Sequence, residues 1–264
     1  MGSVARILMC RPDFFRVSYS INPWMNTQVP VSLSVAIHQW ETLKNTLESC
    51  GATIELLPPA RHVPDLVFTA NAALVKGKKA FVSHFLHKER KPERQENIRW
   101  FQRHGFEVHG GTRYPFEGAG DALFAGDTLF AAYGPRSDKR VYDDIQAAFG
   151  SDLVSKLVLC RLVDPKFYHI DVALCPVAPR LALFHRAAFA PEAKELELLE
   201  VPEKEAHQFA CNTVAVGDKH AVLPAGNTQT ASMLEKRGIQ TFQVDVSEFL
   251  KAGGACKCLT LTLE

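Results

Sequence analysis

Four short stretches of this 264-residue chain place polar or reactive side chains within apolar sequence that is typical of β-strands. Their members are Asp65 and Asn71 on either side of Phe68, Glu117 and Asp121 among small residues, His169 and Asp171, and Cys258 near the end of the chain. On a strand, His169 and Asp171 would share one face. A buried carboxylate costs several kcal/mol unless it is paired or hydrogen-bonded. Four such stretches in one chain therefore indicate a common functional site.

Together these residues supply a thiol nucleophile, an imidazole acid and base, and several carboxylates. The thiolate is the reactive form of cysteine, and a neighbouring imidazolium or a bound cation favours it. Because carboxylates favour a cationic ligand, the set predicts attack by cysteine on a planar, positively charged carbon. A guanidinium group has these properties, and two carboxylates can hold its N–H edges and orient its carbon for attack.

Purely structural roles, a metal site and a protease fit the same residues less well. A single strand histidine is more often a satisfied core residue, and a single acidic residue beside glycine is usually part of a turn. A zinc site made by Cys256, Cys258 and His169 would lack a second ligand pair at the usual spacing. A papain-like protease would have its cysteine before its histidine, which is the reverse of the order here. We therefore expect no metal and no cofactor.

Composition excludes several classes of partner. The formal net charge is +1, so no long-range field favours nucleic acid or a membrane surface. No segment approaches the roughly 18 apolar residues that a membrane span needs. The first residues do not resemble a signal peptide, so the seven cysteines are interpreted as thiols in a reducing, cytoplasmic compartment. Most of these cysteines, Cys256 included, are expected to be buried packing residues.

Amphipathic helices followed by short strands recur along the chain. The spacing of Leu33, Ile37, Trp40, Leu43 and Leu47 predicts a helix that Gly51 ends, with a strand over 52–57. The same order recurs in 96–110, 141–163 and 231–246, where Gly105 and Gly238 end two of the helices, and in shortened form in 191–202. Pairs of β-rich runs at 65–85, 120–134, 168–185 and 211–224 predict hairpins between the helices.

This pattern amounts to about five ββαβ units of roughly forty to sixty residues, which predicts a closed α/β propeller with a central channel. A doubly wound sheet is disfavoured because no Gly-x-Gly-x-x-Gly follows a strand and opens a helix. No linker or low-complexity tract interrupts the chain. We therefore expect one catalytic domain over residues 1–264.

Five stretches give the chain a resemblance, nearly end to end, to the guanidino-group-modifying or pentein superfamily. They are CRPDFFRVSYSINPWMN, PDLVFTANAAL, FEGAGDALF, YHIDVALCP and GGACKCLTL, in the order found in that family. The superfamily includes arginine deiminase, dimethylarginine dimethylaminohydrolase, the amidinotransferases and the arginine dihydrolases. Its fold is a five-bladed α/β propeller, which agrees with the five units counted above.

The resemblance implies a role for each matched residue. Cys258 is the nucleophile that forms an S-alkylthiouronium intermediate at the guanidinium carbon. His169 protonates the leaving amine and then activates water. Glu117 holds the guanidinium and supports His169, while Asp65 and Asp171 bind guanidinium nitrogens. The Gly253-Gly254 pair lets the backbone turn so that a following strand presents the thiol.

Further residues are expected around the substrate. Arg136 resembles the arginine that binds the substrate α-carboxylate, and Arg90 is a second candidate for that role. Asn22 lies on a loop expected to cover the substrate, and Phe68 lies between two of the binding residues.

Asn71 is a departure from the deiminase and dimethylarginine hydrolase pattern, which has aspartate here. The stretches FTAN and INPWM resemble the arginine dihydrolase branch. Asparagine offers a donor and an acceptor, so it can also bind a neutral ureido group. The sequence thus predicts a hydrolase that converts arginine to ornithine, ammonia and carbon dioxide. A dimethylarginine dimethylaminohydrolase, an amidinotransferase, a silent binder of cationic amino acids, and a homodimeric assembly stay open.

Overall fold

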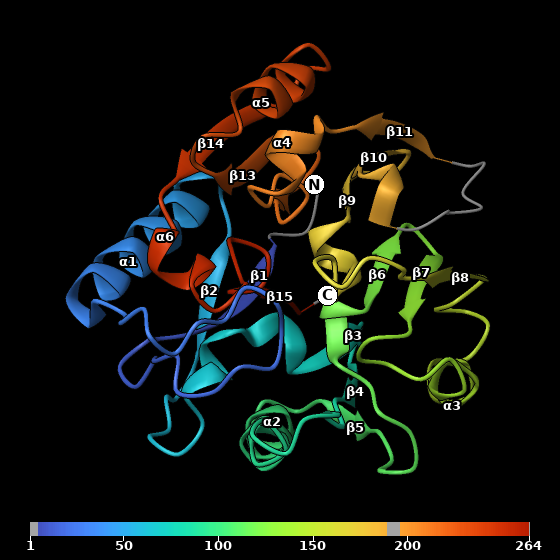
Figure 1. Cartoon of the computed structure of the whole chain (residues 1–264). Coiled ribbons are helices and arrows are strands. Elements are labelled where there is room, and N and C mark those ends of the chain that lie inside the picture. Colours follow the sequence, from blue (N-terminus) through green and yellow to red (C-terminus); the bar gives the residue numbers. More distant parts are fainter. Residues whose placement is uncertain (1–4, 189–195, 264) are drawn as a thin grey trace.

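The computed structural model describes residues 5–188 and 196–263. Within these ranges the strands form five three-stranded sheets. Figure 1 shows the sheets arranged in a ring, with helices α1, α2, α3 and α5 on its outer side. The prediction of a five-bladed α/β propeller is confirmed.

Four of the five sheets follow the predicted ββαβ order within the described residues, and the second sheet shows it most simply. Strands β3 (Ala73–Lys76) and β4 (Lys79–Val82) form an antiparallel hairpin. Helix α2 (Glu93–Arg103) then leads to β5 (Glu107–His109), which pairs parallel with β4. The helix makes the crossover that a parallel strand pair requires.

The third and fifth sheets repeat this order, whereas the segment between the second and third strands of the fourth sheet includes residues 189–195, which lie outside the described ranges. The third contains β6 (Ala122–Ala125), β7 (Thr128–Tyr133), α3 (Val141–Phe149) and β8 (Lys156–Arg161). The fourth contains β9 (Leu174–Ala178), β10 (Leu181–Phe184) and β11 (Glu197–Glu200), and α4 (Glu203–Ala206) follows it. The fifth contains β12 (Val214–Val216), β13 (His220–Pro224), α5 (Thr228–Glu235) and β14 (Gln240–Val244), followed by α6 (Ser247–Leu250).

The first sheet joins the two ends of the described chain. Strand β1 (Arg6–Cys10) pairs antiparallel with β15 (Leu261–Thr262) and parallel with β2 (Thr53–Leu57), after helix α1 (Leu33–Ser49). It is therefore the same ββαβ unit, except that its first strand comes from the end of the chain. This pairing closes the ring.

The helix predictions hold with two differences. Helix α1 buries Trp40, Leu43 and Leu47 as expected, but Leu33 in its first turn is 38% exposed, and Ala36 is buried in its place. The shortened helix expected at the start of 191–202 falls on 191–195, outside the described residues, while the strand expected after it is β11. The glycines expected to end helices do so, each with a positive φ angle: Gly51, Gly105 and Gly238.

The stretches that carry the polar residues are short 3₁₀ turns, so the expectation that they are strands is wrong. Turns η1 (Pro64–Val67) and η2 (Thr69–Asn71) precede β3, η3 (Gly118–Gly120) precedes β6, and η4 (Ile170–Val172) precedes β9. His169 precedes η4 and Asp171 lies within it, so the two do not share a strand face. In a tight turn, these side chains stay at the ring centre. On a paired strand, they would instead point into the apolar layers on either side of the sheet.

The apolar core lies between each sheet and its neighbours, and its largest cluster joins α1 to the fourth and fifth sheets. Cys256 is fully buried in this cluster, as expected for a packing residue. None of the helices in residues 5–188 and 196–263 has the length and apolar character needed to cross a membrane.

Candidate active site

Every sheet contributes a polar or reactive side chain from the few residues that precede its first strand. These residues are Asn71 before β3, Glu117 before β6, His169 before β9, Asn212 before β12, and Cys258 before β15. Strand β9 contacts β6 and β12 of the neighbouring sheets, so the first strands lie innermost in the ring. The repeat therefore brings one such side chain from each unit to the ring centre.

A small cavity of about 10 Å³, here called the front cavity, brings most of the predicted site residues together. Seven of the predicted residues line it: Asn22, Asp65, Phe68, Asn71, Arg90, Arg136 and Cys258. The other three, Glu117, His169 and Asp171, are hydrogen-bonded to members of this set or to one another. All ten predicted residues thus belong to one connected cluster, although positions 22 and 258 are far apart in sequence.

Glu117 forms the centre of one charged group. Its Oε2 atom lies 2.9 Å from His169 Nε2 and accepts a hydrogen bond of 2.8 Å from Arg136 Nη1. Burial by itself raises the pKa of the Glu117 carboxyl, but Arg136 and His169 outweigh it and hold the pKa well below its usual range. Burial lowers the pKa of His169 to about 4, although Glu117 opposes the shift. Near neutral pH the carboxylate is therefore ionised and the imidazole is neutral.

Arg136 lies against this carboxylate instead of facing open solvent. Its Nη2 atom donates to the Ile21 carbonyl oxygen at 2.8 Å, and its guanidinium lies 4.8 Å from the centre of the Tyr168 ring. Because Arg136 also lines the front cavity, the geometry keeps it beside any bound molecule. Its expected role in binding an α-carboxylate remains a prediction.

Cys258 lies in a turn before β15 and not on a strand, which corrects the expected position of the thiol. Its Sγ atom accepts a hydrogen bond of 3.1 Å from Asn212 Nδ2, and its S–H donates to Asp171 Oδ2 at 3.3 Å. Burial and then Asp171 raise the pKa of the thiol well above its usual value. Burial raises the pKa of Asp171 to about 7, against the opposing hydrogen bond from Cys258. A bound cation would reverse both shifts.

Asp65 and Asn71 are held by neighbours on the other side of the front cavity. Tyr19 donates its hydroxyl hydrogen to Asp65 Oδ2 at 2.9 Å. Asn71 donates to the Glu117 carbonyl at 2.9 Å and accepts a hydrogen bond of 2.9 Å from Arg90 Nη1. These bonds fix which end of the Asn71 amide is the donor.

Arg90 is anchored from behind by Glu93, which accepts two hydrogen bonds of 2.7 and 2.9 Å from its guanidinium. Arg90 is only 4% exposed. Its contact with Asn71 places it at the wall of the front cavity, where it was predicted as a second candidate for binding the α-carboxylate.

Asn22 ties the loop over the site to the segment that leads to Cys258. Its Nδ2 donates to the Ala252 carbonyl at 3.0 Å, and its Oδ1 accepts a hydrogen bond of 2.9 Å from the Trp24 backbone N–H. Three residues of the loop over 11–32, Ile21, Asn22 and Met25, line the front cavity, and the covering of a bound substrate by this loop stays a prediction.

Gly254 is required for a reason that the sequence does not reveal. A Cβ atom at this position would lie 2.3 Å from the Phe68 ring, so the glycine makes room for an aromatic side chain at the cavity wall. Phe68 in turn packs edge-on against Phe15, with ring centres 5.7 Å apart.

We expect Gly254→Ala to destabilise the protein by about 1–3 kcal/mol, because the new methyl group overlaps a ring that is already closely packed. Chemical denaturation would measure the change in the free energy of unfolding. Gly111→Ala is the matched control, since its Cβ would meet only one neighbouring atom, at 3.9 Å. Equal stability of the two variants would contradict this packing role.

Asn212 is the main site residue that sequence reasoning missed. It is fully buried, donates to Cys258 Sγ and to the Asp171 carbonyl, and accepts a hydrogen bond of 3.1 Å from the Cys258 backbone N–H. It lies two residues before β12, as Asn71 lies two residues before β3. A comparison of equivalent positions in the repeat would have identified it. Tyr19 and Tyr168 were also missed, because their contacts join distant segments, and Glu93 was missed although its partner Arg90 lies only three residues before it.

We expect Asn212→Ala to lower kcat by about 10- to 100-fold, because the sulfur loses the amide that orients it and favours its ionised form. The pH dependence of Cys258 alkylation by iodoacetamide separates this effect from misfolding. The alkylation profile should move to higher pH in the variant. An unchanged profile would show that Asn212 does not act on the thiol.

The five-bladed ring, with a buried cysteine, a histidine–glutamate pair and further carboxylates at its centre, defines a member of the guanidino-group-modifying (pentein) superfamily. The family model described as N,N dimethylarginine dimethylhydrolase, eukaryotic, matches residues 20–264. The chain belongs to this family.

Two curated relatives with different named activities cover nearly the whole chain. A bifunctional arginine dihydrolase/ornithine cyclodeaminase from Synechocystis is 40% identical over 99% of the chain, which spans 38% of that protein's length. The N(G),N(G)-dimethylarginine dimethylaminohydrolase of Mycobacterium tuberculosis is 36% identical over 98% of the chain and 85% of its own length.

The fold also matches solved structures. The N-terminal domain of the cyanobacterial arginine dihydrolase ArgZ, in a cysteine-to-serine variant bound to substrate, superposes with a TM-score of 0.89 at 37% identity, covering 98% of both chains. An asparagine-to-serine variant of the same domain, at 38% identity and a TM-score of 0.90 over 98% of both chains, has been solved covalently bound to a reaction intermediate.

Proposed function

We propose that this protein is a hydrolase of amidino carbon–nitrogen bonds, and that its substrate is arginine, which it converts to ornithine, ammonia and carbon dioxide. The observation that carries the proposal is the pair of buried carboxylates, Asp65 and Asp171, beside the Cys258 thiol. Each has one oxygen with no hydrogen-bond donor among the described residues. A planar cation with several N–H groups supplies the donors that both carboxylates lack.

Binding of such a cation activates the nucleophile. In the free site the thiol is protonated, because burial and Asp171 disfavour the thiolate. A guanidinium held between the carboxylates reverses the local charge and favours the thiolate. The activation of the thiol in the first cycle therefore depends on the positive charge of arginine.

The bond changes follow from these positions. The Cys258 thiolate attacks the guanidinium carbon. Neutral His169 takes up the proton that the thiol loses, ionised Glu117 stabilises the imidazolium, and His169 gives this proton to the departing nitrogen as the C–N bond breaks. Water then gives a proton to His169 and attacks the thiouronium carbon, and the C–S bond breaks to release the thiolate. The first cycle converts arginine to citrulline and ammonia. A second cycle at the ureido carbon gives ornithine, ammonia and carbon dioxide.

The choice of arginine over dimethylarginine depends mainly on Asn71. Its amide is fixed by Arg90 and by the Glu117 carbonyl, and it presents no negative charge to the substrate. An amide tolerates a neutral ureido group where a carboxylate favours a cation. The named activity of the cyanobacterial relatives supports this choice. The family model and the mycobacterial relative favour dimethylarginine hydrolysis, which is the second candidate.

Incubation with arginine, citrulline or asymmetric dimethylarginine, followed by analysis of the amino acid and amine products, tests the proposal. We expect ornithine and ammonia from both arginine and citrulline. Accumulation of citrulline as the sole product would exclude the dihydrolase. Release of dimethylamine without action on arginine would establish the second candidate, and transfer of the amidino group to added glycine would indicate an amidinotransferase. Stoichiometric binding of arginine with no product would indicate a silent binder.

We expect Asn71→Asp to make citrulline accumulate, with ornithine formation lowered by at least about tenfold relative to citrulline release. The variant loses the N–H donated to the Glu117 carbonyl and adds a charge that favours the cationic substrate over the neutral one. The ratio of the two products, measured over time, reports the change. Asn26→Asp, at an exposed loop position, is the control and should leave the ratio unaltered. An unchanged ratio in Asn71→Asp would remove this residue from the explanation of product choice.

A further inference from the structure

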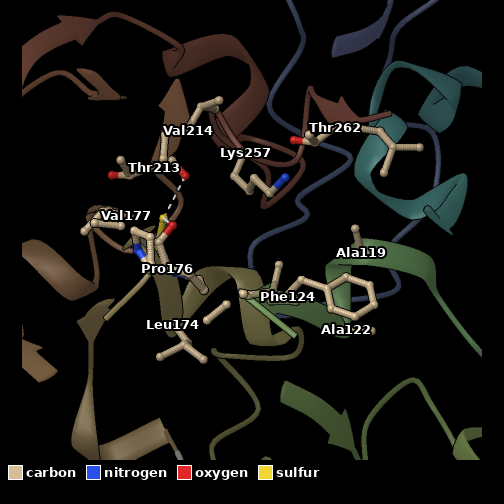
Figure 2. Close-up of a pocket in the computed structure, with 18 of the residues that line it drawn as sticks. Ala119, Ala122, Phe124, Leu174, Pro176, Val177, Thr213, Val214, Lys257 and Thr262 are labelled. Carbon is tan, nitrogen blue, oxygen red and sulfur yellow. Dashed lines mark hydrogen bonds between the residues drawn. The ribbon is translucent and has the colours of Figure 1, made fainter. Parts of the chain in front are cut away.

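A second cavity of about 450 Å³, here called the rear cavity, lies at the ring centre and shares no lining residue with the front cavity (Figure 2). Its walls come from the first strands β3, β6, β9, β12 and β15 and from the turn that holds Cys258. Two of its lining residues are direct sequence neighbours of site residues, since Thr213 follows Asn212 and Lys257 precedes Cys258. A third, Ala119, precedes Gly120, which lies beside the His169 ring. The rear cavity therefore lies immediately behind the layer of turns that carries the active-site residues.

Lys257 is the unusual residue of this cavity. Figure 2 shows its side chain reaching into the cavity between walls formed by residues such as Leu174, Val177 and Val214. Among residues 5–188 and 196–263, no hydrogen bond or ion pair involves its ammonium group. Burial lowers its pKa, with Asp171 as the strongest opposing charge. A half-buried ammonium among apolar side chains costs free energy that an anionic partner would offset.

The other charged residues in or near the rear cavity do not supply an anionic partner for Lys257. Lys76, also on the cavity wall, is occupied elsewhere: its Nζ donates to the Gly126 carbonyl at 3.3 Å and lies 4.8 Å from the centre of the Phe124 ring. Asp218 lines the cavity but forms no ion pair with Lys257 in the described part of the chain. Asp171, Cys175 and Cys258 act on Lys257 only through space.

We propose that the rear cavity binds a monocarboxylate with an apolar body, with the carboxylate on Lys257 Nζ and the hydrocarbon part against the walls formed by β9 and β12. The cavity volume falls within the ~300–1,000 Å³ typical of small-molecule sites, which are mostly apolar with few polar groups that fix orientation. Lys257, whose ammonium group has no partner among the described residues, matches one anionic head group on an apolar body. A phosphate or a dicarboxylate would leave a second charge against the apolar wall.

Occupation of this site also affects the active site. Lys257 is one of the charges that oppose the raised pKa of Asp171, together with hydrogen bonds from Cys258 and Asn212. A carboxylate that neutralises Lys257 removes this opposition, so the pKa of Asp171 rises further. This second part of the inference rests on the proposed function, because it requires that ionised Asp171 take part in turnover.

Calorimetric titration with 4-methylpentanoate tests the binding site without relying on activity. We use the Cys258→Ala variant in saturating arginine, so that the front cavity is occupied and arginine is not consumed. We expect one molecule to bind per chain, the neutral 4-methylpentanamide to fail to bind, and an added Lys257→Met substitution to weaken binding by at least about tenfold. Lys76→Met is the matched control and should bind normally.

Two results would overturn the site: no binding of 4-methylpentanoate at about 10 mM, or equal binding with Lys257→Met. If Lys257→Met does not fold, Ala215→Phe tests the same site by filling the cavity from β12, and normal binding to that variant would count against the proposal. For the coupling, 4-methylpentanoate should move the acid limb of the pH–rate profile to higher pH in the wild type but not in Lys257→Met. If 4-methylpentanoate binds but the acid limb of the pH–rate profile does not move, only the effect of the rear cavity on Asp171 is overturned. An inactive wild-type enzyme would count against the proposed function alone.

Discussion

Replacement of Cys258 by alanine is expected to abolish turnover of arginine, with a loss in kcat of about 10⁴-fold or more. Under the proposed function, the substitution removes the sulfur that attacks the guanidinium carbon, while the neighbouring Asp171 and Asn212 remain. Binding should therefore survive the loss of chemistry. Ammonia release measures turnover, and calorimetric titration with arginine measures binding.

Cys256→Ala is the matched control for this prediction. Cys256 lies two residues away, is fully buried in the apolar core and makes no contact with the front cavity. The control should lose some stability through a small cavity but keep most of its activity. Full activity in Cys258→Ala, or equal inactivity in both variants, would remove the assignment of the nucleophile.

Substitution of His169 by alanine is expected to stop the reaction after the first covalent step or to slow that step severely. Its imidazole is neutral in the free protein and lies 2.9 Å from ionised Glu117, so it can take up a proton and hold it in contact with an anion. Without it, no other described group in contact with Glu117 Oε2 can exchange protons near neutral pH, since the remaining partner is Arg136. Turnover should fall by about 10³-fold.

Mass spectrometry of His169→Ala after incubation with arginine separates the two steps. An adduct on the peptide that contains Cys258 would show that attack still occurs and that hydrolysis of the thiouronium fails. His207→Ala is the control, because the His207 ring lies outside the front cavity and its Nδ1 atom pairs with the Glu203 carbonyl of its own helix. Normal turnover by His169→Ala would contradict its role as acid and base.

The repeat could be predicted because it depends on local patterns. Helical spacing, glycine after each helix and paired β-rich runs each depend on a few neighbouring residues, and five copies together specify a closed ring. The strand β15 was not expected to belong with β1, since that pairing joins the two ends of the described chain.

The site was predicted as a set of residues but not as a geometry. Glu117 and His169 were identifiable because polar residues are costly to bury in apolar sequence, and Cys258 because its stretch resembles the superfamily pattern. Their true setting in and beside short turns was missed, since apolar residues around a short turn resemble those of a strand. The contacts of Glu117 with Arg136 and with His169 depend on tertiary packing, which no local pattern encodes.

The seam between β1 and β15 consists of only two residue pairs, Ile7 with Thr262 and Leu8 with Leu261. The sulfur of Cys258 is three positions from that seam, whereas the imidazole and carboxylates belong to blades whose strands are continuous in the chain. Fraying of β15 would therefore displace the thiol and remove activity, while the other four sheets stayed folded. Activity therefore depends on the short pairing between β1 and β15.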